Sequence, residues 1–200
     1  WECLARTLRE PAVPIRVAES ARLEDLHVLG FAIQSAPSLG DSLKTLFDYG
    51  SLLTTSGSWR LGVAGPRAKL VWRRPAAATL GVRLSNETAV AQCVGALRQL
   101  VGGDFDPIEV HLRHERPADV GAHDRFFRAP VRFGHDEDGV VIGRDLLAAR
   151  SPGANAALWT YLCRDAAARS ERVRARSVTD LVVEIVTRTL EDRPGRLPSM

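Results

Sequence analysis

The chain has 200 residues, 45% of them apolar, which fits one domain that buries a core without covalent cross-links. Its cysteines, Cys3, Cys93 and Cys163, lie far apart and form no CxxC pair, so we expect neither a disulfide framework nor a zinc site, and a cytoplasmic location. No apolar run approaches the roughly 18 residues of a membrane span, so no membrane partner is expected. The net charge of +3 is dispersed and forms no basic stripe of the kind that binds nucleic acid.

Helical spacing dominates the first 53 residues. It predicts a helix over residues 2–9, ended by the prolines up to Pro14, and a short buried helix over residues 26–35. Ser38 is a suitable N-cap for the next helix, because leucines recur behind it at three- and four-residue steps and Asp41 favours the positive end of the helix.

The spacing then changes to the two-residue period of strands. Residues 59–63 and 69–73 predict a hairpin that turns at Gly65-Pro66. A helix is expected to begin at residue 85 or 86 and to run to residue 100, with an apolar face of valines and leucines and a stop at Gly102-Gly103.

Strands and helices also remain separate in the second half. The pattern predicts a strand over 108–115, a short helix carrying Phe126-Phe127, two strands over 131–133 and 140–142 joined by an acidic turn, and helical segments at 146–147, 156–172 and 177–190. Because strands and helices do not alternate in regular units, we predict an α+β fold: a small antiparallel sheet with flanking helices and a C-terminal linker helix region.

Four histidines, His111, His114, His123 and His135, are the grouping best suited to enzyme chemistry. His111 and His114 are three residues apart on a predicted strand, so their side chains point to opposite faces and do not share a metal ion. The sequence also has no GxSxG or SxxK motif and no glycine-rich phosphate loop. We therefore predict no metal site, no cofactor and no enzyme activity.

His114 ends an apolar row on the strand predicted over residues 108–115. Alternation places it on the same face as Ile108, Val110 and Leu112. Two interpretations are open: a histidine at the edge of the core, bonded to the backbone or to Glu115, or a polar contact in a ligand pocket.

Aromatic residues gather on the predicted sheet and its covering helix, where they indicate a core and not a cofactor site. A partly filled core is nevertheless where a pocket forms. The candidate ligand-binding residues are His114, Trp72, Phe127 and Phe133.

The C-terminal helices suggest a connection to something else. Leu158, Tyr161 and Leu162 form an apolar stripe on the helix over 156–172, which packs on the domain or pairs with a second copy of the chain. The helix over 177–190 is followed by a proline- and glycine-containing break and a new serine cap, a pattern typical of entry into another domain.

Several segments together resemble the arabinose-binding-like N-terminal domain of AraC-type transcription regulators. Residues 29–40, LGFAIQSAPSLG, are similar to the LGxAxxSAPTLGEAL passage of that family. Residues 108–117, IEVHLRHERP, are similar to its PxxVxFxHxxP strand, and residues 125–134, RFFRAPVRFG, to its FFGxPVxFG turn. One departure is Arg128, which stands where the family has glycine.

This resemblance implies an effector-binding regulatory domain over residues 1–175, with a linker helix and the start of a helix-turn-helix domain over 176–200. It implies a small-molecule effector, a homodimer through Leu158, Tyr161 and Leu162, and contact with promoter DNA only through a C-terminal domain beyond Met200. The alternatives are a small cytoplasmic enzyme of unknown reaction and an interaction module without a ligand. The lining of any pocket distinguishes the three.

Overall fold

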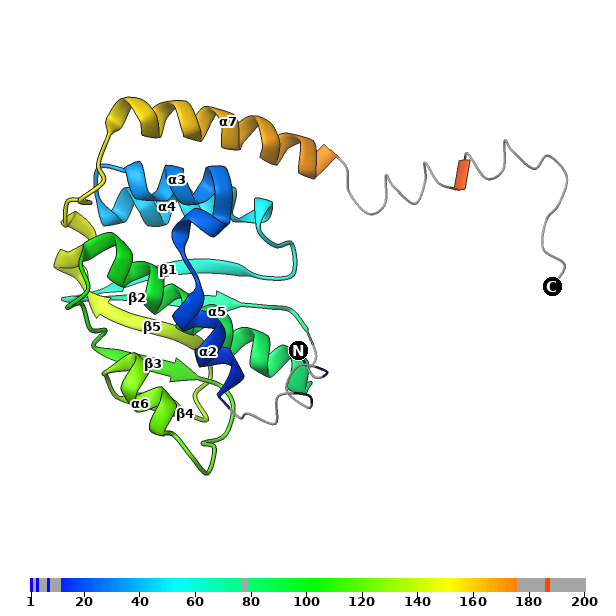
Figure 1. Cartoon of the computed structure of the whole chain (residues 1–200), viewed down its shortest axis with the longest axis vertical. Coiled ribbons are helices and arrows are strands. Elements are labelled where there is room, and N and C mark those ends of the chain that lie inside the picture. The colour runs from blue at the N-terminus through cyan, green and yellow to red at the C-terminus, as the bar shows by residue number, and fades with distance from the viewer. Residues whose placement is uncertain (2, 4–6, 8–11, 77–78, 176–185, 188–200) are drawn as a thin grey trace, which may run out of the picture.

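The computed structural model describes residues 1, 3, 7, 12–76, 79–175 and 186–187. Helices and strands are segregated in an α+β arrangement, as predicted (Figure 1). In chain order the elements are α2 (Val13–Ser20), η1 (Leu23–Leu26), α3 (His27–Ser35), α4 (Leu39–Tyr49), η2 (Gly50–Leu52), β1 (Ser58–Ala64), β2 (Arg67–Arg73), α5 (Leu80–Val101), β3 (Glu109–Leu112), α6 (Gly121–Phe127), β4 (Val131–Phe133), β5 (Asp138–Gly143), η3 (Arg144–Ala148) and α7 (Ala156–Ala175).

The sheet has five strands in the order β1-β2-β5-β3-β4. Neighbouring strands of the sheet are antiparallel except for β3 and β4, which run parallel, with Val110 opposite Val131. The two strands predicted on either side of the acidic turn are therefore not partners of each other, because β3 lies between them. Helix α6 provides the crossover that a parallel pair requires.

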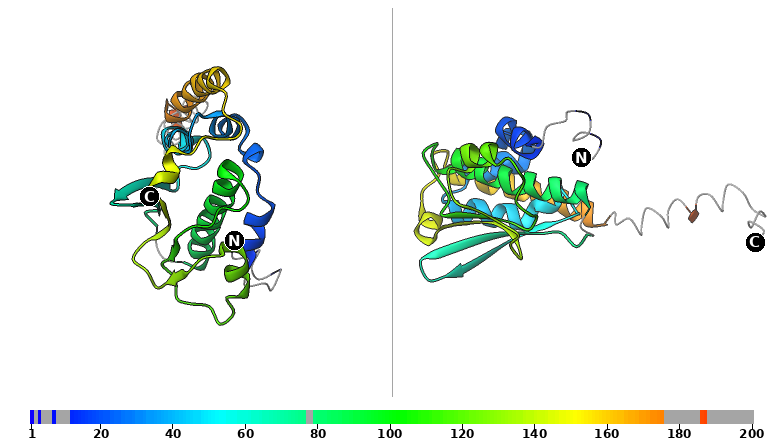
Figure 2. Two further views of the ribbon diagram at one scale, coloured as in Figure 1. Left: turned by 90° about the vertical axis from the view of Figure 1, so that its left-hand side faces the viewer. Right: turned by 90° about the horizontal axis from the view of Figure 1, so that it is seen from below.

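Helix α5 lies across one face of the sheet, and α2 packs on α5. Helices α3, α4 and α7 form a stack on the β1 side of the sheet, at the top of Figure 1 (Figures 1 and 2). Helix α7 is the outermost element of this stack. Between α5 and the sheet, Val90, Val94, Val110 and Val140 are fully buried. Burying such side chains contributes about 1.5–3 kcal/mol each and fixes α5 as the central support of the domain.

The structure departs from two local expectations. Pro14 lies in the first turn of α2, a helix that the sequence pattern did not predict, and a proline costs no hydrogen bond at that position. Helix α5 begins at Leu80, whereas the predicted start is residue 85 or 86. The Thr79 side chain accepts a hydrogen bond from the Val82 amide and caps the helix there.

Other local predictions are confirmed. Ser38 caps α4 by accepting a hydrogen bond from the Asp41 amide, and the hairpin predicted around Gly65-Pro66 is β1–β2. Arg128 ends α6 with φ of 53°, so the chain makes a left-handed turn at the position where the family that it resembles has glycine. Its side chain contacts Asp106, with 2.6 Å between Nε and Oδ1, which compensates for part of that strain.

Two predictions concern residues outside the described part of the chain. The helix predicted over residues 2–9 and the helix over 177–190, with the break that follows it, both fall largely on such residues. Within the described part, no helix has the length and apolar character needed to cross a membrane.

Candidate functional site

A cavity of about 680 Å³ lies between α5 and the layer formed by η1, α4 and η2. Its volume falls within the range of about 300–1,000 Å³ typical of small-molecule sites. Most of its wall is apolar. The residues that form this wall include Leu23, Leu26, Ile33, Leu43, Leu46, Phe47, Trp59, Trp72, Ala89, Cys93, Ala96, Leu97 and Leu100.

The cavity is elongated because it follows one face of α5. Lining residues of α5 run from Ser85 to Leu100, a rise of about 22 Å at 1.5 Å per residue. At the first end the Trp72 indole donates a hydrogen bond to Asn86, and at the second the Leu23 amide donates one to Gln99. Trp72 therefore marks one end of the cavity, and Leu23 marks the other.

Polar side chains line both ends of the cavity and, as Ser42, Thr88 and Gln92, part of its length. Arg74 lies at the Trp72 end, with its guanidinium carbon 5.8 Å from the centre of the Trp72 ring. The Arg74 Nε is buried and has no hydrogen-bond partner. Near the middle, Cys93 faces the cavity, and burial raises the pKa of its thiol to about 12. That thiol is therefore a neutral part of the apolar wall and not a nucleophile.

A buried chain of hydrogen bonds holds the Trp72 wall in place. The Trp72 Nε1 donates to the Asn86 Oδ1 at 3.1 Å, and the Asn86 Nδ2 donates to the Asp138 Oδ2 at 3.0 Å. The Asp138 Oδ1 accepts from the Arg113 amide at 2.9 Å. On the other side of the indole, Gly57 lies so close that a Cβ there would be 2.4 Å from the ring. Trp72 therefore has one position available.

A second buried cluster joins α5, α6 and the segment after β3. Glu87, only 2% exposed, places Oε1 2.8 Å from the His123 Nε2 and Oε2 2.9 Å from the His114 Nε2. The His114 contact is close but not aligned as a hydrogen bond, and the His114 Nδ1 donates to the Glu115 carbonyl at 2.8 Å. Phe133 packs edge-on against both imidazoles.

The histidines determine the ionisation of Glu87. Burial alone raises the pKa of this carboxyl, but the contacts with His114 and His123 outweigh burial and lower the pKa to about 2. Glu87 is therefore a buried carboxylate at neutral pH. Three elements far apart in sequence share this one charge, which indicates that the cluster stabilises the fold.

The structure separates the four candidate ligand-binding residues. Trp72 lines the cavity, whereas His114, Phe127 and Phe133 are not part of its wall. His114 and Phe133 lie in the Glu87 cluster, and Phe127 is fully buried in the core. The hydrogen bond from His114 to the Glu115 carbonyl fits the interpretation of a histidine at the edge of the core, and a role in ligand binding stays a prediction for all four residues.

The other two histidines of the predicted group, His111 and His135, form a separate pair. The His111 Nε2 lies 2.6 Å from the Glu109 Oε1, and the His111 ring stacks on His135 with 3.8 Å between centroids. Burial lowers the pKa of His111, an effect that the contact with Glu109 opposes. No group of three or more metal-ligating side chains occurs among the residues that the structure describes.

Helix α7 contacts the outer side of the cavity wall. The Trp159 indole donates to the Thr45 hydroxyl of α4 at 3.0 Å, and the Ser170 and Ser51 hydroxyls lie 3.2 Å apart, which ties α7 to η2. Ser51 itself lines the cavity. These two contacts link the cavity wall to α7.

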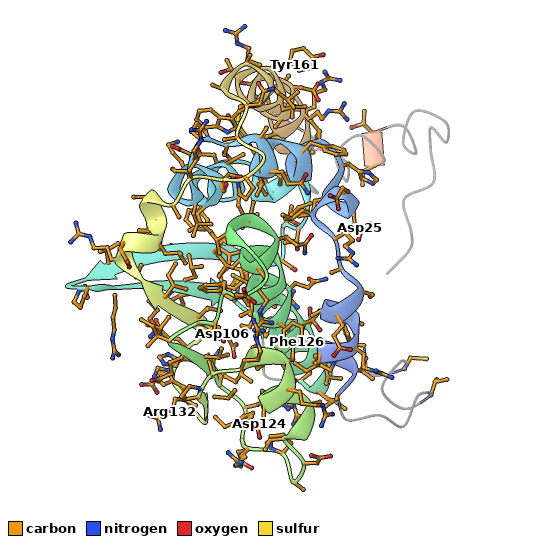
Figure 3. All side chains as sticks on the ribbon, turned by 60° about the vertical axis from the view of Figure 1, so that its left-hand side comes forward. Asp25, Asp106, Asp124, Phe126, Arg132 and Tyr161 are labelled. Atoms are coloured by element: carbon orange, nitrogen blue, oxygen red, sulfur yellow. The ribbon has the colours of Figure 1, made fainter. Side chains whose placement is uncertain are left out.

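The apolar stripe predicted on α7 is only partly used by the domain. Leu162 is half-buried, but Leu158 is 45% exposed and Tyr161 68% exposed. Tyr161 lies on the outer side of α7 (Figure 3). The helix packs on α3 and α4 through its opposite side and leaves these two side chains exposed.

Comparison with known proteins first gives the structural class. The chain resembles the crystal structure of the transcriptional regulator CdpR from Pseudomonas aeruginosa, with a TM-score of 0.68 and 21% identity over 96% of the chain. It spans 62% of the CdpR chain. No curated protein matches the sequence significantly.

A family model then makes the assignment. Residues 1–151 match the arabinose-binding domain found at the N-terminus of AraC transcription regulators. The chain belongs to this family, and the resemblance noted in its sequence motifs is confirmed.

Proposed function

We propose that residues 1–175 form the effector-sensing domain of a bacterial AraC-type regulator, which binds a small molecule in the cavity along α5. The observation that supports this most directly is the position of α4 and η2, which separate the cavity from α7. The domain acts as a binding protein in the cytoplasm and not as an enzyme. It needs no cofactor for this role.

Sensing requires that the ligand prefers one of two arrangements of the domain. A ligand in the cavity contacts Leu46 and Phe47 on α4 and Ser51 on η2, while Thr45 and the same Ser51 hold α7. A ligand-dependent shift of this wall therefore moves or stiffens α7. Because α7 precedes the segment predicted to be the linker over 176–200, it is the natural output of the domain.

The experiment measures amide hydrogen exchange of the protein with and without 8-anilinonaphthalene-1-sulfonate. The fluorescence of this largely apolar probe reports its binding. We expect the probe to bind the cavity and to slow amide exchange in α4, η2 and α7. Ala96→Phe fills the cavity from α5 and should abolish both effects, whereas Ala118→Phe, in an exposed loop outside the cavity, should leave them intact. Probe binding that leaves exchange in α7 unchanged would contradict the sensing function.

We also propose that the domain forms a homodimer through Leu158, Tyr161 and Leu162. The exposure of Leu158 and Tyr161 on an outermost helix supports this contact (Figure 3). A regulator that recognises two DNA half-sites must bring two copies together, and promoter DNA is then contacted through a separate C-terminal domain.

Tyr161→Arg tests this contact without disturbing the fold, since the Tyr161 side chain is 68% exposed. We expect the wild-type chain to sediment as a dimer at micromolar concentration and the dissociation constant of the variant to be at least 10-fold higher. In a symmetric contact the two introduced arginines face each other, and their like charges repel. Arg164→Glu, an exposed change on the same helix, is the control. A wild-type chain that is monomeric at this concentration would exclude the proposed contact.

A further inference from the structure

We propose that the effector is a long-chain carboxylic acid, whose carboxylate binds Arg74 and whose alkyl chain lies along α5. This inference rests on the proposed sensing function and adds the chemical class of the ligand. It is carried by the shape of the cavity, the composition of its wall and one arginine without a partner.

The shape and the wall favour an alkyl chain. The residues of α5 that line the cavity span about 22 Å of that helix, which is the length of a long unbranched chain rather than of a sugar or an amino acid. Leu46 and Phe47 on one side and Cys93 and Leu97 on the other form its middle section. Sugars need many hydrogen-bonding partners, whereas this mainly apolar wall offers a few, such as Thr88 and Gln92. An alkyl chain needs only apolar contact.

Arg74 supplies the charge for a head group. Among the described residues no carboxylate pairs with it, and its Nε is buried without a hydrogen-bond partner. The other charged residues of the wall are less suited to this role: Asp48 is negative and pairs with Lys44, and Arg22, at the far end of the cavity, is exposed to solvent. A buried donor left unpaired costs about 1–3 kcal/mol, so an acceptor from the ligand would remove a real penalty.

A carboxylate fits this arginine better than a phosphate does. The planar guanidinium matches the two oxygens of a carboxylate, and a single arginine balances a single negative charge. Trp72 fixes the guanidinium from one side at 5.8 Å and is itself held by Asn86. The head group therefore meets a prearranged partner at the Trp72 end, and the chain extends towards Leu100.

The test is displacement of 11-(dansylamino)undecanoic acid from the full chain by palmitate, with 1-hexadecanol as the uncharged control. We expect palmitate to displace the probe from the wild-type chain and to bind Arg74→Gln about 10- to 100-fold more weakly, since hydrogen bonds to charged groups contribute about 1.5–3 kcal/mol. Hexadecanol should bind the wild type and Arg74→Gln equally. Arg74→Lys should recover part of the palmitate affinity.

The neighbouring Arg73 provides a matched control. Its side chain is exposed, pairs with Glu137 and does not line the cavity, so Arg73→Gln should leave palmitate binding unchanged. Failure of palmitate to bind, or equal losses for palmitate and hexadecanol in Arg74→Gln, would overturn the proposed ligand class. Palmitate that binds through Arg74 without changing exchange in α7 would support this ligand class and contradict the sensing function, so the two failures are distinguishable.

Discussion

Glu87→Ala is expected to lower the free energy of unfolding by about 3–5 kcal/mol at pH 7, the cost of removing one partner from a buried charged cluster. The substitution removes the acceptor that lies 2.8 Å from the His123 Nε2 and leaves His114 facing the space that the carboxylate occupied. Urea unfolding at pH 7 measures the loss. Glu115→Ala, an exposed change beside His114 that keeps the backbone carbonyl, is the control and should cost less than about 0.5 kcal/mol.

The same substitution has a pH signature. Because the histidines lower the pKa of Glu87 from 4.5 to about 2, this group contributes about 3 kcal/mol of stability above pH 4.5, and the contribution disappears as the pH falls through about 2. The difference between wild type and Glu87→Ala should therefore shrink as the pH falls below 4.5. A difference that persists undiminished at pH 3 would show that packing, and not charge, is the main contribution of Glu87.

Features that depend on neighbouring residues could be predicted from the sequence. The Ser38 cap acts on an amide three residues away, and the β1–β2 hairpin turns within a few residues of Gly65. The parallel pairing of β3 and β4 could not be predicted in this way, because it depends on which strand β5 takes as a partner. The start of α5 differs from the predicted one because Thr79, which precedes the apolar pattern, caps the helix.

The candidate site was harder to predict than the fold. Glu87 and His123 are 36 residues apart, and no local pattern joins them. A signal was nevertheless present, since Glu87 lies three residues after Leu84 and three before Val90, on the apolar face of the helix. A carboxylate on such a face needs buried partners. The cavity left no comparable signal, because the lining leucines have the same helical spacing as leucines that fill a core.

Asp138→Ala is expected to lower the free energy of unfolding by about 2–4 kcal/mol and also to weaken binding in the cavity. Asp138 lies opposite Trp72 in the β2–β5 ladder and accepts hydrogen bonds from the Asn86 side chain and the Arg113 amide. Its loss leaves the buried Asn86 amide and the partly buried Arg113 amide without this acceptor, and an unpaired buried donor costs about 1–3 kcal/mol. Asp136→Ala, an exposed change in the same turn, controls for loss of charge and should have little effect.

The effect on binding distinguishes this network from an ordinary buried hydrogen bond. Asn86 orients the Trp72 indole, and Trp72 in turn supports Arg74, so freeing Asn86 loosens the wall at the end where the head group is proposed to bind. We expect Asp138→Ala to bind the dansyl probe several-fold more weakly at a temperature where the variant is still folded. Asp138→Asn retains one acceptor oxygen, so its affinity for the probe should lie between those of the wild type and Asp138→Ala. Reduced stability with unchanged probe affinity would mean that Gly57 and the sheet hold Trp72 in place without the hydrogen-bond network.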